Sequence, residues 1–434
     1  MKPLLSIIFI TLTIVISAIN SQDAGCIDFL NPLDVSDRKH VPCPYVKTKP
    51  STLKFQAGDN MFDIRFACGT QDKVLCDKAR KGFEAVGKVI SASIILKSKI
   101  VMSAKIAPFD DPRILGAAGP ARVMPLSDPT DNIKRLYPQA LVKQFSLTDA
   151  PQFGDIDIDA QFNSGANFWF DGDPPIAANQ PNFHTVVLHE MFHGMGFFSG
   201  YRDWMNILVN NNPILDPVVT PMPTFLNENP IVFGEFVETI FDKQVRILTQ
   251  NNKTLTKLTT EFNTYVIPKT TFIDPNDFIT KFKASQAYTS GKSFLQTAQT
   301  PKSLLFVPTA PKANVPEGGF LETAISYQRG SSVSHLDQKT YTNTPDFLMR
   351  HSLEPGATTD KLIQLGGNYS GGAIGPLLLD IMSSIGYATV DNPKAPNNPK
   401  PPSTNPNTPN NNPTTLPLYE LPRTITLQTQ PTST

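Results

Sequence analysis

An apolar segment near the middle of the chain carries two histidines four residues apart. The segment reads Val186-Val-Leu-His189-Glu190-Met-Phe-His193-Gly-Met-Gly196. Its periodicity predicts a helix over about residues 183–195, which Pro181 and Asn182 would start and Gly194 or Gly196 would end. Residues four apart lie about 40° apart around a helix axis, so His189 and His193 would project from the same face. The two imidazoles can therefore point at one metal ion.

The same helix carries a carboxylate, Glu190, beside the two histidines. Glu190 is turned about 100° away from His189, yet it stays near enough to reach water bound to the same metal. Zinc lowers the pKa of bound water to about 7, and a carboxylate can take the proton, which leaves a hydroxide able to attack a carbonyl. The four-residue spacing also occurs by chance in buried helices. The apolar helix after a predicted strand favours one catalytic Zn²⁺ ion, with Glu190 as the base.

A catalytic zinc site needs a third protein ligand and an open position. The short form of the motif would place a histidine six residues after His193, but Ser199 stands there. We predict His335 as the third ligand, with His351 as the runner-up. Two carboxylates in a segment predicted to be helical, residues 233–248, are a minor alternative: Glu235 and Glu238.

Three stretches of the sequence resemble the metzincin metallopeptidases, and specifically their leishmanolysin-like members. The stretches are His193-Gly-Met-Gly196-Phe, Ser334-His335-Leu-Asp337 and Asp346-Phe-Leu-Met349-Arg-His-Ser-Leu353. The resemblance implies that His335 is a distant third ligand and that Met349 belongs to the Met-turn beneath the zinc. The resemblance spans roughly residues 80–390; it is specific at the zinc helix and looser between residues 200 and 320.

The resemblance also implies a way to bind substrate. In metzincins an edge strand above the zinc helix pairs with an extended peptide, and the predicted strand over residues 155–162 is the candidate here. Two departures from the family pattern bear on the site. His193 and His335 lie 142 residues apart, so a large insertion must fold in a way that returns His335 to the metal. Gln338 follows Asp337 where related sequences tend to carry an acid.

The elements predicted around these motifs mix helices and strands. Periodicity predicts helices over residues 78–96 and 375–385, strands over residues 100–106 and 155–162, and a loop over residues 115–121. We therefore expect an α+β fold, with a metzincin-like catalytic domain over residues 78–390. It would contain a twisted mixed sheet, the zinc-binding helix, and a lower subdomain that carries the third ligand and the Met-turn.

The first residues, 1–21, are typical of a signal peptide, because one basic residue precedes an apolar run that ends in small residues. A retained signal anchor is the alternative, but the apolar core is short for a spanning helix. Secretion agrees with four cysteines whose even number predicts two disulfides in one of three pairings: Cys26, Cys43, Cys68 and Cys76. A thiolate that caps the zinc in a latent precursor is the weaker alternative. Residues 22–77 are predicted to be a disulfide-tied segment or a pro-segment.

Composition limits the partners of the chain. Lys plus Arg and Asp plus Glu both number 38, so there is no electrostatic footprint for nucleic acid and no basic stripe for a membrane surface. We expect no stable membrane insertion, and the sequence does not specify an oligomeric state. Residues 391–434 are rich in Pro, Asn and Thr and are predicted to form a disordered tail. Asn252 and Asn368 begin glycosylation triplets.

Together these features predict a secreted, extracellular zinc endopeptidase that acts on protein or peptide substrates. Two other classes remain open. One is a catalytically inactive, zinc-containing adhesion or matrix protein, although a purely structural zinc does not need Glu190. The other is a hydrolase of a non-peptide amide with the same zinc chemistry. An extended cleft beside the 155–162 strand would favour the peptidase, and a small closed pocket would favour the other hydrolase.

Overall fold

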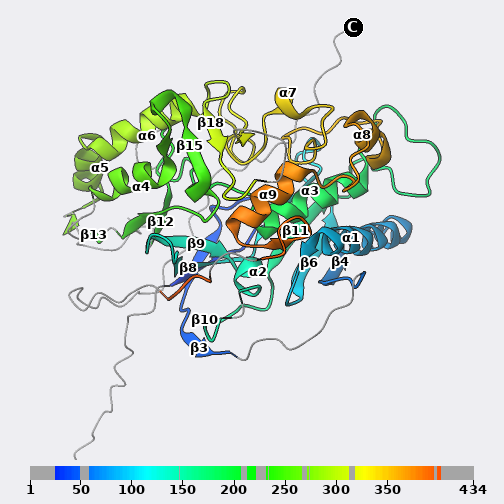
Figure 1. Ribbon diagram of the computed structural model, residues 1–434, viewed down its shortest axis with the longest axis horizontal. Helices are drawn as coiled ribbons and strands as arrows, with labels where there is room; N and C mark the ends of the chain where they lie inside the picture. Colours follow the sequence, from blue (N-terminus) through cyan, green and yellow to red (C-terminus); the bar gives the residue numbers. More distant parts are fainter. Residues whose placement is uncertain are drawn as a thin grey trace, which may run out of the picture.

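The computed structural model describes residues 25–48, 58–145, 147–206, 213–220, 231–232, 234–265, 271–272, 274–311, 318–394 and 398–401. The predicted signal peptide and most of the predicted tail lie outside these residues. The architecture mixes helices with several small sheets. In Figure 1, helices α4, α5 and α6 group on one side of the molecule, helix α1 and strands β4 and β6 lie on the other, and helices α3 and α9 lie between them.

A four-stranded mixed sheet supports the candidate helix. Its strands, in the order β4-β6-β11-β7, are Phe62–Cys68, Ile100–Ala107, Ile158–Asn163 and Gly116–Pro120. Strands β4, β6 and β11 run parallel, and β7 runs antiparallel to β11 at the edge. The side chains of β6 alternate between buried and more exposed, as its sequence predicts, because successive residues of a strand face opposite sides of the sheet.

Two helices pack against this sheet and against each other. Helix α1 spans Lys73–Ser93 and α3 spans Phe183–Met195, and the rings of Phe83 and Phe183 meet edge to face with their centroids 5.5 Å apart. Helix α1 begins earlier than the predicted residue 78, because the Asp72 side chain accepts a hydrogen bond from the Leu75 N–H. It ends at Ser93, since Ile94–Ile95 (β5) pairs instead with Ala388–Thr389 (β20).

The cysteine-containing segment folds together with the rest of the chain. Strands β1 (Cys26–Phe29) and β2 (Arg38–Val41) join β8 (Arg122–Ser127) and β9 (Lys134–Pro138) in an antiparallel sheet ordered β2-β1-β8-β9. Strand β3 (Tyr45–Lys47) pairs with β10 (Asp149–Pro151). The predicted boundary at residue 77 lies inside α1. Two disulfides are present, and they connect neighbouring cysteines: Cys26–Cys43 and Cys68–Cys76.

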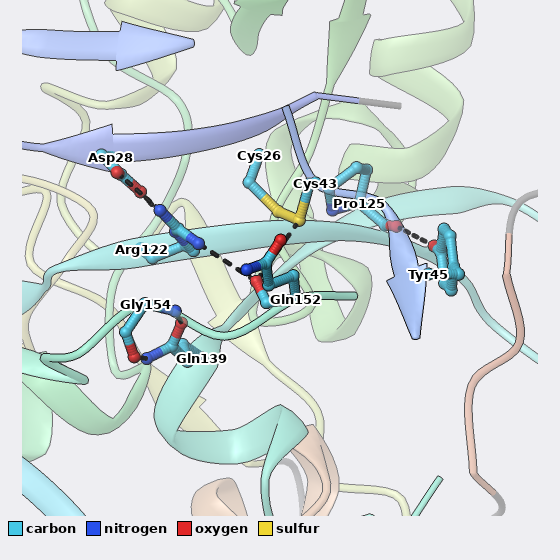
Figure 2. The surroundings of a disulfide bond; sticks show 9 residues. All are labelled: Cys26, Asp28, Cys43, Tyr45, Arg122, Pro125, Gln139, Gln152 and Gly154. Atoms are coloured by element: carbon cyan, nitrogen blue, oxygen red, sulfur yellow. Dashed lines mark hydrogen bonds and ion pairs between the residues drawn. A yellow bond between two sulfur atoms is a disulfide. The ribbon is translucent and has the colours of Figure 1, made fainter. Parts of the chain in front are cut away.

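Figure 2 shows how the Cys26–Cys43 disulfide sits beside a polar junction between β1 and β8. The Arg122 guanidinium donates to both Asp28 carboxylate oxygens, with Nη2 2.8 Å from Oδ2, and its Nη1 donates to the Gln152 carbonyl. The Arg122 side chain therefore fixes the N-terminal hairpin to the body of the protein.

The predicted insertion after α3 forms a region of short strands and helices. Its paired strands are β12 (Val218–Thr220) with β14 (Glu235–Val237), β13 (Ile231–Val232) with β17 (Thr271–Phe272), and a sheet in the order β16 (Lys253–Thr254), β15 (Val245–Ile247), β18 (Leu304–Phe306) and β19 (Gly319–Phe320). Its helices are α4 (Leu255–Asn263), α5 (Pro275–Lys283) and α6 (Gln286–Thr297), with 3₁₀ turns η1 (Asp242–Gln244) and η2 (Leu248–Gln250). The predicted helix over residues 233–248 is wrong, because this segment contains the paired strands β14 and β15.

The remaining elements complete the core. They are α2 (Gln139–Val142), α7 (Gln338–Tyr341), α8 (Thr359–Leu365) and α9 (Pro376–Ile385). Helix α9 matches its predicted range to one residue, since Gly375 precedes Pro376 at the first helical position. In the predicted tail, Lys400 and Ser127 exchange two backbone hydrogen bonds of 2.8 and 2.9 Å. Among the described helices, none is both long enough and apolar enough to cross a membrane.

Candidate metal centre

Local chemistry defines the two ends of α3. The Asn182 side chain accepts a hydrogen bond from the Thr185 N–H at 2.9 Å, which caps the N-terminus. Gly196 ends the helix at φ +122°, a backbone conformation that L side chains rarely adopt. A side chain at Gly194 would collide with Ile158, so this glycine lets α3 pack closely on β11. The helix thus has the range that its sequence predicts, with its histidines beside the sheet.

The structure brings His189, His193 and His335 together. Their three Nε2 atoms lie 3.1 Å from one another in every pair. Two nitrogens bound to a tetrahedral zinc at about 2.0–2.1 Å would lie about 3.3 Å apart, so the observed triangle fits such an ion closely. Among the described residues, these three are the His, Cys, Asp or Glu side chains grouped to hold a metal ion.

Each imidazole is held by a hydrogen bond from its other nitrogen. The Nδ1 atoms of the three histidines lie 2.6, 2.6 and 3.0 Å from the backbone carbonyl oxygens of Leu348, Phe197 and Ser331, respectively. A carbonyl oxygen can only accept, so Nδ1 carries the proton and Nε2 presents its lone pair to the centre of the cluster. Carbonyl partners of this kind orient metal-binding histidines.

Main-chain pairing carries His335 back to α3. The His335 carbonyl accepts from the Glu322 N–H at 2.8 Å, and the Leu336 N–H donates to the Met349 carbonyl at 2.8 Å. The segment therefore lies between the end of the insertion and the predicted Met-turn. Beside it, the Ser334 hydroxyl accepts from the Ser199 N–H at 3.1 Å, so the chain leaving α3 contacts the segment that brings the third histidine.

The alternative ligands lie outside the cluster. Nδ1 of His351 lies 3.0 Å from Glu322 Oε2, and this histidine is not grouped with the other three. Glu238 is buried and accepts from Arg135, with Nε 2.6 Å from Oε1, while Glu235 pairs with Lys134. Both glutamates belong to β14 or its end rather than to a helix, and neither is grouped with the three histidines.

Met349 is buried, and its carbonyl accepts a hydrogen bond from the N–H of Leu336, the residue that follows His335. Leu348, the preceding residue, supplies the carbonyl that holds His189. The backbone of the predicted Met-turn therefore has a direct part in orienting the first histidine. The assignment of Met349 to a Met-turn stays a prediction.

Glu190 connects α3 to the sheet edge. Its Oε2 atom accepts a hydrogen bond from the Ala118 N–H at 2.9 Å. Burial raises the pKa of Glu190 to about 8, and the hydrogen bond from Ala118 acts in the opposite direction. A cation close to this carboxylate would favour its ionised form. The Glu190 side chain is therefore held beside the sheet edge. Its protonation state depends on whether a cation is bound close to it.

Burial also determines the charge of the histidines. Desolvation lowers the pKa of His189 to about 4 and holds the pKa values of His193 and His335 well below their usual range. All three imidazoles are thus neutral at neutral pH. Neutral imidazole is the form that binds a metal ion.

The structure corrects the predicted edge strand. The sequence places the edge at residues 155–162, but β11 lies inside the sheet, between β6 and β7. The edge is β7, within residues 115–121 where the sequence predicts a loop, because its glycines and alanines give no alternating pattern.

The backbone of β7 alternates between its partner strand and the open side. The Ala121 N–H donates to the Asp157 carbonyl, and the Leu115 carbonyl accepts from the Asn163 N–H, both at 2.9 Å. Backbone groups that face the partner strand recur at every second residue. Ala118 lies an odd number of residues from both Leu115 and Ala121, so its N–H points away from β11 and reaches Glu190.

A partly enclosed cleft lies along this edge. Its walls include residues 117–120 of the β7 region, Glu190, His193 and His335, together with Phe29 from the N-terminal hairpin. Arg202 and Trp204 line the same cleft. Sequence patterns gave no signal for Ala118, Phe29 or Arg202, since their roles depend on contacts between distant segments.

Comparisons with known proteins give a family but no activity. A family model described as SPBPB7E8-like matches residues 22–415. An uncharacterized protein of Schizosaccharomyces pombe is 27% identical over 366 residues, which cover 76% of this chain. The chain spans 63% of the length of that relative. No solved structure matches the chain.

Proposed function

This chain belongs to the SPBPB7E8-like family, and we propose that it is a secreted zinc endopeptidase that hydrolyses peptide bonds in proteins or peptides. The observation that carries the proposal is the histidine triangle. Three neutral imidazoles direct Nε2 at one point, each oriented by a carbonyl at Nδ1, and Glu190 follows the first of them on the same helix. A zinc ion in such a three-histidine site supplies Lewis-acid polarisation of a carbonyl and a lowered pKa for water.

Glu190 would serve as the general base and then as the general acid. Its carboxylate accepts the proton of the attacking water and passes it to the nitrogen of the leaving amine, so the peptide bond breaks with no net change in protons on the protein. The hydrogen bond from Ala118 to Oε2 fixes the side chain and leaves Oε1 to face the reacting water.

The free edge of β7 favours a peptide as substrate. An extended peptide can add to this edge by donating main-chain hydrogen bonds to the outward carbonyls of β7, since the Ala118 N–H is held by Glu190, and the cleft that contains Glu190, His193 and His335 lies beside it. Secretion is supported by the two disulfides, which form in oxidising compartments. Both predicted glycosylation asparagines, Asn252 and Asn368, are exposed.

The rival is a secreted zinc protein without activity. A zinc that only stabilises the fold is normally enclosed by four protein ligands, whereas this cluster offers three, and two of them line a cleft. The buried carboxylate of Glu190, held in the wall of that cleft, has no purpose in a purely structural site.

The test compares the secreted full chain with its Glu190→Gln variant on a mixed peptide library at equal zinc content. The amide oxygen of the introduced glutamine can still accept the Ala118 hydrogen bond, so the fold and zinc content should be retained while hydrolysis falls about 10²- to 10⁴-fold. The exposed Glu84→Gln variant on α1 is the matched control and should keep wild-type activity. Equal cleavage by wild type and Glu190→Gln, or zinc-loaded wild type that cuts no peptide, would overturn the proposal.

A further inference from the structure

Arg202 lines the cleft beside the histidine cluster, and part of its guanidinium lacks a hydrogen-bond partner. Its Nη1 atom is buried with no such partner among the described residues. Burial lowers the pKa of Arg202, but a guanidinium stays charged at neutral pH. A buried cation without a hydrogen-bond acceptor is costly, and the cost disappears when an anion binds there.

A second arginine, Arg38, packs against Trp204, which lines the same cleft. The Arg38 guanidinium lies over the Trp204 ring, 4.3 Å from its centroid, while the Arg202 guanidinium is 5.9 Å from that centroid. Both terminal nitrogens of Arg38 are likewise buried without a partner among the described residues. Burial lowers the pKa of Arg38 to about 10, and the like charge of Arg202 acts in the same direction.

The two carboxylates that favour the charged form of Arg202, Asp203 and Asp242, are held by other donors. Asp203 binds Arg329 through two contacts of 2.7 and 2.9 Å. Asp242 accepts from the Ser199 hydroxyl and from the backbone N–H groups of two further residues. Asp216 instead favours the charged form of Arg38; its Oδ1 accepts from the Met205 N–H at 3.2 Å, and its Oδ2 is buried without a hydrogen-bond partner among the described residues. The acceptor that Arg202 requires would therefore come from the cleft.

We infer that Arg202 recognises a carboxylate of the substrate at the Trp204 end of the cleft, with Arg38 and Trp204 positioning it. This inference rests on the proposed function, since it names the chemistry of the substrate for that same cleft. Guanidinium groups bind carboxylates through paired hydrogen bonds, which gives both affinity and direction. Because His193, His335 and Arg202 line one cleft, the recognised group would lie close to the scissile bond. It is an Asp or Glu side chain, or the C-terminal carboxylate of the peptide.

Two octapeptide libraries test the inference, one with amidated and one with free C-termini, and each compares Glu, Gln and Lys at every position. Wild-type kcat/KM should favour Glu at one position by about 10- to 100-fold, as expected for a hydrogen bond to a charged group. Arg202→Gln should abolish this preference, and Arg202→Glu should reverse it in favour of Lys. Arg65→Gln, on exposed β4 at the opposite edge of the sheet, should leave it unchanged. Faster cleavage of free than of amidated C-termini, with no Glu preference and with the difference lost in Arg202→Gln, would identify the terminal carboxylate as the recognised group.

Binding separates this inference from the proposed function. Calorimetry with the Glu190→Gln protein measures affinity for the Glu and Gln peptides without turnover. Tighter binding of the acidic peptide that disappears in the Arg202→Gln/Glu190→Gln double variant upholds the inference even if the wild type hydrolyses nothing. Equal affinity for the Glu and Gln peptides together with equal affinity for free and amidated C-termini, or a preference that survives loss of Arg202, overturns it while leaving any observed hydrolysis in place.

Discussion

Glu190 Oε2 lies 2.9 Å from the backbone nitrogen of Ala118, so a residue of the histidine helix and a residue of the sheet edge share one hydrogen bond. The contact brings the proposed base and the proposed peptide-binding strand into one unit. Both depend on the close packing of α3 on β11, which Gly194 permits.

This relationship gives a prediction for two neighbouring proline variants. Ala118→Pro removes an N–H that points away from β11, whereas Ala117→Pro removes one that points towards it, so only the second breaks the sheet. Ala118→Pro leaves the pairing with β11 intact but removes the donor to Glu190, so it should lower kcat/KM about tenfold or more. Ala117→Pro should lower the free energy of unfolding by about 1–3 kcal/mol through the broken sheet bond. Urea unfolding and peptide hydrolysis measure the two effects, and wild-type kcat/KM in a folded Ala118→Pro protein would contradict the role of this hydrogen bond.

The third ligand can be identified by comparing His335→Asn with His351→Asn. His335 completes the Nε2 triangle, so its loss should weaken zinc binding by more than the roughly 10- to 100-fold that loss of a supporting partner costs. His351, which lies against Glu322 instead, should change the affinity less than about tenfold. Competition with a zinc chelator measures both. A larger effect at His351 would make the runner-up the true ligand.

The stability of the metal-free protein should depend on pH through the histidines. In the unfolded chain they take up protons as the pH falls through about 6.5, whereas the folded pKa of His189 is about 4 and those of His193 and His335 are also well below their usual range. Their contribution to stability is therefore fully present above about pH 6.5 and is lost as the pH falls towards 4. Each histidine adds about 1.4 kcal/mol per pH unit to the slope in this window.

The measurement is the difference between wild type and His335→Asn in chelator, because other groups titrate in the same range. The raised pKa of Glu190 acts in the opposite sense, but it is common to both proteins. Between about pH 4.5 and 6.5 the free energy of unfolding should rise with pH more steeply in the wild type than in the variant. The difference in slope should be about 1.4 kcal/mol per pH unit, which corresponds to one proton. Parallel slopes would show that His335 is not held neutral in the folded state.

The two disulfides should differ in their effect on substrate binding. Replacing Cys26 and Cys43, or Cys68 and Cys76, by serine should lower the free energy of unfolding by about 3 kcal/mol in either case, because both close short loops. The first pair also fixes the hairpin that carries Phe29 into the cleft, so its loss should raise KM as well. A KM increase of equal size in the second variant would separate the hairpin from substrate binding.

The helix α3 could be predicted from sequence because every signal for it is local. Its apolar periodicity, the Asn182 cap and the Gly196 end all lie within the helix or next to it. Ile100–Ala107 was predictable for the same reason, since burial alternates along the strand itself. The two histidines of α3 share a face by geometry alone, so their proximity needed no knowledge of the fold.

The sequence-based predictions that were wrong concern segments whose structure depends on pairing between residues far apart in the chain. Strand β7 consists of small residues whose sequence shows no strand period, and it forms a strand because it pairs with β11. The same pairing places β7, and not β11, at the edge of the sheet. The segment around Glu235 has apolar residues at helical spacing, yet β14 pairs with β12 and β15 with β18. The position of Arg202 beside Trp204 and Arg38 involves separate segments of the chain, which no local pattern records.

The histidine cluster joins two parts of the chain 142 residues apart, a far longer span than the 17 and 8 residues bridged by the two disulfides. A metal ion held by all three imidazoles would therefore cross-link the folded chain over the longest of the three spans, and because it binds the folded site and not the unfolded chain, its binding free energy adds to the stability of the fold. It also sets an order of assembly. The site cannot form during synthesis until the chain through His335 has emerged and folded back onto α3, so metal loading would mark a completed catalytic region.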